Sequence, residues 1–246
     1  MATPKLKNSP IIEVVCEFRF ELENPNDATL PGRLYDIVKN EFPIIKNRNL
    51  GTVLPNDGNT NQAELLLTPL AQFYNLEENL LLQVGHNMLA VNSIKKYPTW
   101  EIFKPVILDS FRQYSEIAKP KSIVKIILQC INKIHIDSKD FQLSDYFLYY
   151  PPSPGNITEP LTAFNMHIDT LLNHERDILT MINFSVLPDN GKEGQSAFIL
   201  DLRYTMNKSG TLQFDQIDNW LETAHDELYK AFNASITEKL LNHFNI

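Results

Sequence analysis

The chain has 246 residues, of which 43% are hydrophobic and 21% are charged, and its formal net charge is −8 at pH 7. This length and composition support one large hydrophobic core or two fused half-cores. No apolar run approaches the roughly 20 residues that span a bilayer. An acidic chain without a basic stripe also lacks the Lys and Arg contacts that supply most non-specific affinity for nucleic acid. We therefore expect neither a membrane segment nor a nucleic-acid partner.

The two cysteines, Cys16 and Cys130, both fall on the apolar side of predicted strands. This placement favours buried, reduced thiols in a cytoplasmic protein, and a disulfide between them is the alternative. The first ten residues carry two lysines but no hydrophobic stretch, so they do not resemble a secretory signal. We expect a cytoplasmic location.

The first half of the chain opens with a strand that follows Pro10 and has a nearly pure two-residue period. The apolar phase of this strand consists of Ile12, Val14, Cys16, Phe18, Phe20 and Leu22. The other elements expected in this half are a helix at 31–42, a loop at 47–62, an antiparallel meander at 63–68, 71–76 and 80–92, and a helix at 99–118.

The second half repeats this order with changes. Its first strand, at 123–136, has an apolar phase made of Val124, Ile126, Leu128, Cys130, Ile134 and Ile136. The elements expected after it are a short helical stretch at 143–149, a proline-rich connection at 151–160, strands at 163–172, 177–187 and 196–206, with a loop at 188–195, and a final helix that starts near Asp215. Apolar spacing of three and four extends that helix to roughly 28 residues, or about 42 Å. The excess length could cross onto the first half or onto another subunit.

The repeated order of strand, helix, strands and long helix predicts an α+β fold made of two duplicated β-α-β(n)-α units, at 1–119 and 120–246. A constant offset also aligns the apolar phase of 80–88 with that of 198–206. Two such units form a curved antiparallel sheet with helices on one face. The order resembles the saddle of TATA-binding-protein-like folds, which implies an exposed concave sheet face but not DNA binding.

The start of the chain also resembles a known family. Residues 9–20 read Ser-Pro-Ile-Ile-Glu-Val-Val-Cys-Glu-Phe-Arg-Phe, which is similar to the PPI-x-EVV-C-E-[FIL]-R-F opening of a sporadically distributed family of bacterial and archaeal proteins of similar length without a settled function. The segment around Ala224, His225 and Asp226 is similar to the C-terminal helix of that family. The resemblance implies a prokaryotic accessory or mobile-element protein, for example a component of phage defence.

Motifs for catalysis and cofactor binding are missing from the sequence. The glycines form neither a dinucleotide-binding G-x-G-x-x-G pattern nor a phosphate loop, and no H-E-x-x-H or C-x-x-C pair occurs. His167 and His174 are more plausible as surface imidazoles than as metal ligands, and His225 fits a helix surface or an interface. Cys16 and Cys130 have neither a base nor a helix terminus beside them. We expect no cofactor, no metal and no catalytic residue.

The best candidate site is the solvent side of the sheet. Period-two alternation places a set of mostly polar residues on that side: Glu13, Glu17, Arg19, Glu21, Lys125, Ile127, Gln129, Ile131, Lys133, Asp201 and Arg203, with His135, Gln83 and Asn87 as additions. A solvated face with weak cross-strand ion pairs is the simplest interpretation. Ile127 and Ile131 favour a recognition surface instead, since a partner would cover them. Burial by a second chain or by another helix is a third interpretation.

A second candidate is the aromatic segment at 146–152, which either anchors an interface or packs on its own sheet. Taken together, the sequence favours a non-enzymatic binding protein. It would engage a protein partner, or another copy of itself, through the sheet face or the long C-terminal helix. The alternative is an enzyme or small-ligand binder with a charged cleft between the two halves.

Overall fold

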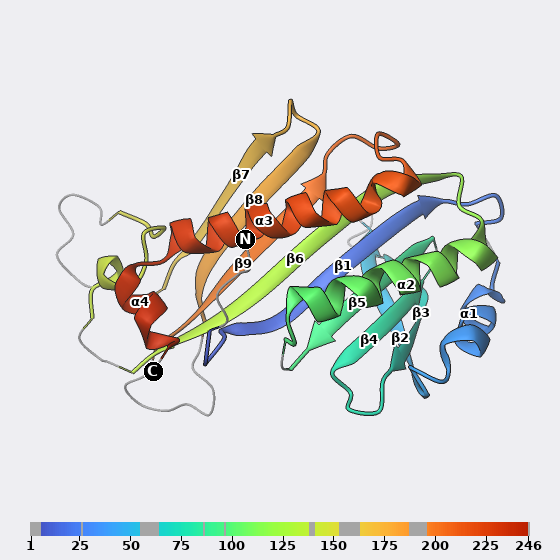
Figure 1. The fold of residues 1–246 in the computed structure, drawn as a ribbon, viewed down its shortest axis with the longest axis horizontal. Helices are drawn as coiled ribbons and strands as arrows, with labels where there is room; N and C mark the ends of the chain where they lie inside the picture. Colours follow the sequence, from blue (N-terminus) through green and yellow to red (C-terminus); the bar gives the residue numbers. More distant parts are fainter. Residues whose placement is uncertain are drawn as a thin grey trace.

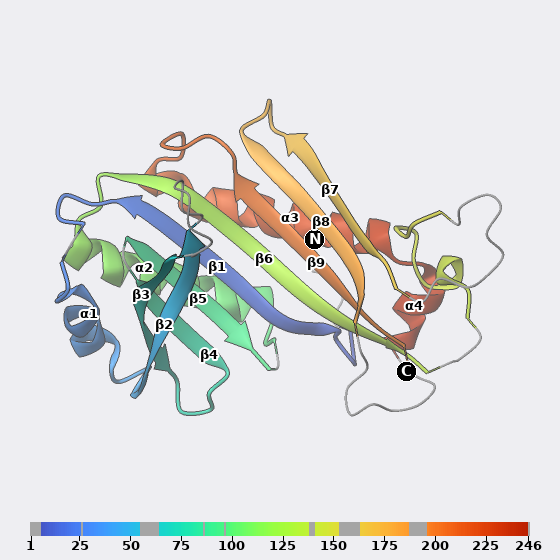
Figure 2. The same ribbon diagram turned by 180° about the vertical axis from the view of Figure 1, so that it is seen from behind.

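The computed structural model describes residues 6–25, 27–54, 64–85, 87–95, 97–137, 141–152, 163–186 and 196–245. These residues form an α+β fold with one nine-stranded antiparallel sheet, in the order β2-β3-β4-β5-β1-β6-β9-β8-β7. The helices lie on one face of this sheet (Figure 1), and the view from behind shows the strands in front of them (Figure 2). The predicted fold class, an antiparallel sheet with helices on one face, is confirmed.

The first half of the chain contributes five strands and two helices to the described structure. These elements are β1 (Ile11–Glu21), α1 (Leu30–Val38), β2 (Ile44–Leu54), β3 (Glu64–Tyr74), β4 (Leu80–Gly85), β5 (Met88–Ile94) and α2 (Trp100–Ala118). The second half contributes β6 (Ser122–Ile136), η1 (Leu143–Asp145), β7 (Asn165–Leu172), β8 (Asp177–Val186), β9 (Ser196–Met206), η3 (Phe214–Gln216), α3 (Ile217–Ser235) and α4 (Glu238–His243).

The middle of the sheet is the antiparallel pair of β1 and β6, in which Val14 lies opposite Cys130 and Cys16 opposite Leu128. From each of these two strands the chain crosses to an outer edge and returns strand by strand. The first return ends in β5 beside β1, and the second ends in β9 beside β6. One sheet therefore spans both halves of the sequence, because the strands on either side of residue 120 belong to it.

The core lies between the sheet and the helices. Phe18 and Phe20 point from β1 toward α2, where Phe20 stacks on Tyr114 with ring centroids 4.9 Å apart. In the other half of the sheet, Phe147 contacts Phe198 of β9 at 5.1 Å. Each large apolar side chain buried in this way contributes roughly 1.5–3 kcal/mol.

Two residues that alternation assigns to the buried phase are exposed instead. Ile12 is 41% exposed and Val124 is 39% exposed. Both positions coincide with shifts in the register of β1 against β6, between Ile11 and Glu13 and between Arg19 and Phe20. An irregularity of this kind interrupts the two-residue period, which simple alternation does not anticipate.

Three predictions for the segment from residue 47 to residue 92 are wrong. The expected strands at 63–68 and 71–76 form one strand, β3. The sequence predicts a loop from residue 47, yet residues 47–54 continue β2 and pair with β3. The remainder of that predicted loop, residues 55–62, lies outside the described residues. The expected strand at 80–92 is divided into β4 and β5 by a turn in which Asn87 has a φ of 49°. The segment 80–88, whose apolar phase was aligned with that of 198–206, therefore covers β4 and the start of β5, whereas 198–206 lies within the single strand β9.

The terminal helix is shorter than its periodicity predicts. α3 ends at Ser235, Ile236 is extended, and α4 starts again at Glu238. Residues 146–148 cause the interruption, because the Leu148 N–H donates to the Ser235 carbonyl at 2.9 Å and the Thr237 N–H donates to the Tyr146 carbonyl at 3.0 Å. Backbone pairing thus replaces the helical hydrogen bonds. The 28-residue helix that would reach another subunit does not form.

The aromatic segment at 146–152 packs against its own sheet. Phe147 is fully buried, and the Tyr149 hydroxyl donates to the Met181 carbonyl at 3.2 Å. Both cysteines are free thiols; Cys16 is buried as predicted, whereas Cys130 is half-buried. Among the helices in the described ranges, none is both long and apolar enough to cross a membrane.

Candidate functional site

The helix-free side of the sheet, which we call the open face, brings the predicted site residues together. Alternation along β1 places Glu13, Glu17, Arg19 and Glu21 on this side. Cross-strand partners share a face. These residues of β1 lie opposite residues of β6, which in turn lie opposite residues of β9. The predicted residues added in this way are Lys125, Ile127, Gln129, Ile131, Lys133, Asp201 and Arg203.

A row of hydrogen bonds crosses four strands of the open face in the first half of the chain. The Asn92 amide donates to Glu13 Oε1 at 2.7 Å, and the Gln83 amide donates to Asn92 Oδ1 at 3.0 Å. The row continues as the Gln72 amide donates to Gln83 Oε1 and the Tyr74 hydroxyl donates to Gln72 Oε1, both at 3.1 Å. Gln72 and Asn92 are only 4% and 2% exposed. Each polar group of this first row is held in place by its neighbour.

A second polar row crosses the open face in the other half. The Gln129 amide donates to Asp201 Oδ1 at 2.8 Å, and the Arg203 Nε donates to both carboxylate oxygens of Asp201. This interaction raises the pKa of the Arg203 guanidinium. Farther out, Asp169 of β7 accepts from the Thr180 hydroxyl and lies 3.1 Å from His167 Nε2. Hydrogen bonding by Thr180, followed by that of His167, lowers the pKa of Asp169.

Between the two rows lies a strip that is partly apolar. Val15, Ile127 and Ile131 are half-buried on the open face. The charged groups beside them are the pair of Arg19 and Glu17, whose Nε and Oε1 atoms are 2.7 Å apart. The strip thus combines branched apolar side chains with charges of both signs.

Not every predicted residue belongs to one cluster. Glu21 and Lys125 lie toward one end of the β1–β6 pair, where Glu21 accepts from the Ser122 hydroxyl at 3.0 Å. Lys133 and His135 lie toward the other end, beside a pocket of about 370 Å³. The residues that line this pocket are Asn8, Ser9, Pro10, Lys133, His135, His243 and Phe244. Asn87 lies in the turn between β4 and β5, where its carbonyl accepts from the Phe20 N–H.

Several residues of the two rows escaped the sequence prediction, namely Gln72, Tyr74, Asn92, Asp169 and Thr180. The available signal was a polar side chain within an otherwise apolar run, as at Asn92 after Leu89, Ala90 and Val91. That signal could not be used at Asn92, because the turn after β4 was missed and the phase of β5 was not defined.

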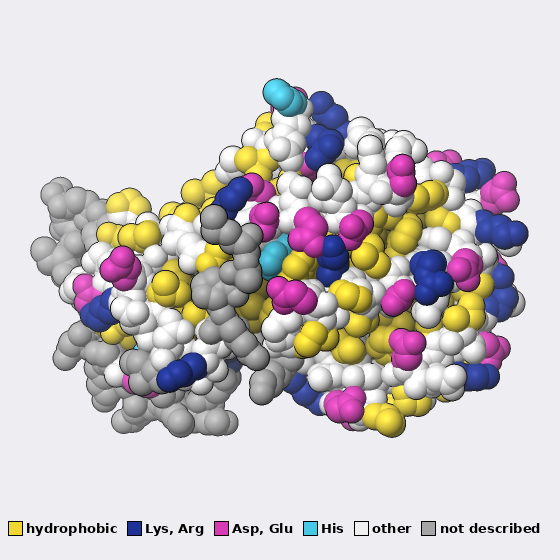
Figure 3. Space-filling view, in the orientation of Figure 1, with side chains coloured by type: hydrophobic (Ala, Val, Ile, Leu, Met, Phe, Trp, Pro, Cys, Tyr) yellow, Lys and Arg dark blue, Asp and Glu magenta, His cyan; other side chains and the backbone are white. Residues whose placement is uncertain are grey.

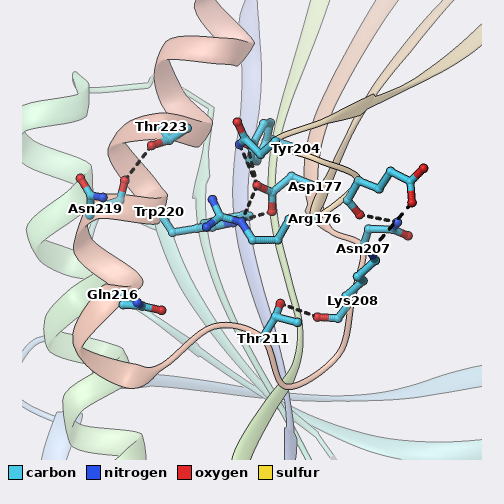
Figure 4. Close-up of polar contacts among 12 residues, drawn as sticks. Arg176, Asp177, Tyr204, Asn207, Lys208, Thr211, Gln216, Asn219, Trp220 and Thr223 are labelled. Carbon is cyan, nitrogen blue, oxygen red and sulfur yellow. Dashed lines mark hydrogen bonds and ion pairs between the residues drawn. The ribbon is translucent and has the colours of Figure 1, made fainter.

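A separate polar cluster surrounds the buried carboxylate of Asp177 at the start of β8 (Figure 4). Oδ1 accepts from the Trp220 indole N–H at 3.0 Å, and Oδ2 accepts from the Tyr204 hydroxyl at 3.0 Å. Arg176 Nε and the Asn173 amide also donate to Oδ2, at 3.1 and 2.9 Å. With four donors and no exposed surface, this carboxylate ties the β7–β8 hairpin to α3. It is a structural group.

The histidines have different surroundings. His225 is part of α3 and stacks on Trp100 of α2, and His174 lies in the β7–β8 turn with a φ of 55°. Within the described residues, no group of three or more His, Cys, Asp or Glu side chains is arranged to hold a metal ion. The helix-bearing face carries interspersed acidic and basic side chains (Figure 3).

Sequence comparison with known proteins found no match. No protein-family model matches the chain, and no curated protein is similar to it at a significant level.

Proposed function

We propose that this protein binds a protein partner through the open face of its sheet. The observation that carries the proposal is the half-buried strip of Val15, Ile127 and Ile131 between two rows of polar side chains. In these rows Asn92 and Asp201 are nearly inaccessible, and each is held by hydrogen bonds to neighbouring strands. Polar groups that are ordered before binding lose little conformational entropy when a partner arrives. The open face is thus better suited to recognition than a set of mobile surface charges.

The chemistry of the open face also indicates the kind of partner. The half-buried Val15, Ile127 and Ile131 would be covered by apolar side chains, while Glu17 and Arg19 offer an acceptor and a donor at the border of this strip. Apolar centres with polar borders are typical of protein interfaces. Mixed charge does not favour nucleic acid, which needs a basic surface.

The test is photo-crosslinking in the cells from which the protein comes. A photoreactive phenylalanine analogue at Ile127 should give a discrete protein adduct, and the same residue at Ile102, which is 58% exposed on α2, is the matched control. Combined Glu17→Ala and Arg19→Ala substitutions should remove the adduct without loss of folding, since an exposed ion pair contributes at most about 1 kcal/mol. An adduct that survives this change, or that forms equally at residue 102, would refute the proposal.

A second candidate function, small-ligand binding, is favoured by the pocket next to Lys133, His135 and His243. Lys133 supplies a cationic group and the two histidines supply hydrogen-bonding groups in a lining that is otherwise largely apolar, with Pro10 and Phe244. Such polar groups suit a small anion. Calorimetric titration with inorganic phosphate would test this function, and Lys133→Met is the informative variant. Heat of binding that is the same in the variant and in the wild type would exclude the pocket as the site.

We also propose that the two halves arose by duplication and that the fold is saddle-like. The shared route of the chain from a central strand to an edge and back supports the duplication. The resemblance of residues 9–20 to a sporadically distributed prokaryotic family supports an accessory role, such as in phage defence. Deletion of the gene followed by challenge with phages tests that role, and unchanged plating efficiency for every phage would count against it.

A further inference from the structure

The side chains of β7, a strand at one edge of the sheet, are mostly exposed to solvent. Apart from Met166 and Leu172, all of its side chains are exposed. Ile168 and Leu171 are 44% and 55% exposed and point to opposite faces of the strand. In Figure 1, β7 lies beyond α3, and among the described elements only β8 pairs with it.

Of the features that usually protect an edge strand, β7 has one charged side chain, Asp169, and lacks lysine, proline and a bulge. Such edges carry lysine, proline or a bulge, which prevents another strand from pairing with them. Residues 165–172 read Asn-Met-His-Ile-Asp-Thr-Leu-Leu, with neither lysine nor proline. The register of β7 against β8 continues without a shift along all eight residues. Among the described residues, the edge is regular and no strand other than β8 pairs with it.

The direction of the free backbone groups follows from the neighbouring hydrogen bonds. The Ser185 N–H donates to the Phe164 carbonyl at 3.1 Å, and this pair continues the β7–β8 register. Hydrogen-bonded positions alternate along an antiparallel strand. Even-numbered residues of β7 therefore bond to β8, and the N–H and C=O groups that face the free edge are those of Asn165, His167, Asp169 and Leu171.

We propose that β7 pairs with β7 of a second copy of this chain around a two-fold axis at Ile168. In this antiparallel register His167 lies opposite Asp169 of the other copy and Ile168 lies opposite its own counterpart. An imidazole donor thus meets a carboxylate acceptor twice. A register centred on residue 169 would instead place two carboxylates opposite each other, which is destabilising. The strand is self-complementary, as an interface between identical copies requires.

Asp169 is already positioned for this contact by the Thr180 hydroxyl on β8. The dimer joins the two sheets into one, and it leaves β1 and β6 of each copy uninvolved. It does not rest on the proposed function of the open face, because the substitutions at Glu17 and Arg19 do not touch β7.

The experiment is sedimentation velocity of the full chain over a wide concentration range. The wild type should show a reversible monomer–dimer equilibrium. Ile168→Lys places two lysines at the axis and should weaken dimerisation about tenfold or more. Ile102→Lys, the same change on the exposed face of α2, is the matched control and should have no effect. A wild type that remains monomeric at all concentrations, or an unaffected Ile168→Lys variant, would overturn the proposal.

A charge exchange tests the register itself. In a homodimer of the Asp169→Lys variant, His167 of each copy would lie opposite Lys at position 169 of the other copy. In a homodimer of the His167→Asp variant, the carboxylate at position 167 would lie opposite Asp169. Each should be monomeric alone, and their mixture should form a heterodimer, because lysine then faces aspartate. Circular dichroism checks that both variants are folded. A mixture of folded variants that does not associate would refute the register centred on Ile168.

Discussion

The indole ring of Trp100 lies flat against the imidazole ring of His225, with centroids 4.4 Å apart and planes inclined by 5°. Trp100 begins α2 and His225 lies in α3, so this stack connects the long helices of the two halves. Beside it, the Trp100 indole N–H donates to Glu222 Oε2 at 3.2 Å, and Lys104 Nζ pairs with Asp218 at 2.7 Å. The contact between the helices therefore depends on a histidine enclosed by charged neighbours.

The protonation of His225 should make the fold sensitive to acid. Burial lowers its pKa from 6.5, although Asp226, Glu222 and Glu101 act in the opposite direction. The unfolded chain then binds a proton that the folded chain does not, so the free energy of unfolding should fall as the pH drops below 6.5. His225→Phe keeps a ring on Trp100 but cannot titrate.

Urea unfolding at about pH 7.5 and about pH 5.5 measures this effect. The loss of stability on acidification should be smaller in the His225→Phe variant than in the wild type. If His225→Phe and the wild type lose the same amount, His225 is not responsible for the acid sensitivity.

Removal of the Asp177 carboxylate should destabilise the fold strongly. Asp177→Ala leaves the buried Trp220 indole N–H and Tyr204 hydroxyl without their acceptor, which costs about 3–5 kcal/mol. Arg176→Gln removes a donor that is 45% exposed and leaves three other donors on the carboxylate, so it should cost less than Asp177→Ala. The comparison uses urea midpoints, and similar midpoints for the two variants would contradict the structural role of the cluster.

Thr237 should stabilise the separate start of α4. Its hydroxyl oxygen accepts from the Leu240 N–H at 3.3 Å and its O–H donates to the Asp145 carbonyl at 2.7 Å. Thr237→Ala removes the helix cap and should cost about 1 kcal/mol, whereas Thr237→Ser should restore most of it. Amide hydrogen exchange of 238–243 should accelerate in the alanine variant. Unchanged exchange would mean that packing of Leu240 alone holds α4.

The thiols should be unreactive in the folded protein. Burial raises the pKa of Cys130 to about 12 and raises that of Cys16 as well, so little of the reactive thiolate exists near neutral pH. A thiol reagent at about pH 8 should modify neither cysteine until a denaturant is added. Rapid labelling of the native chain at either position would show that the strands around β1 and β6 open readily.

Local patterns predicted much of this fold. The buried face of β1, the strands β6 to β9 and the helix α2 follow from alternation and from helical spacing, because each depends on residues close together in the sequence. The interruption at Ile236 does not, since it arises from pairing with residues 146–148, which are far away in the chain. Ile236 and Leu240 are buried as their spacing predicts, and only the backbone between them departs from the helix.

The candidate site shows the same limit. The alternation of β1 indicated that Glu13 and Glu17 share a face, but the partners of these side chains depend on strand order. Asn92 meets Glu13 only because β5 returns to lie beside β1. No pattern within either segment specifies that neighbour, so the hydrogen-bonded rows emerged from the sheet topology.

The position of β1 in the middle of the sheet affects how the protein is made. During synthesis, residues 11–21 leave the ribosome before β5 and β6. They can be joined on one side by β5, but their other edge has no partner until residues 122–136 have been translated. The edge of β1 that later pairs with β6 is therefore unpaired for the time needed to add about a hundred residues, roughly 5–20 s. Formation of β6 ends that exposure, and a chain truncated after α2 should be prone to aggregation.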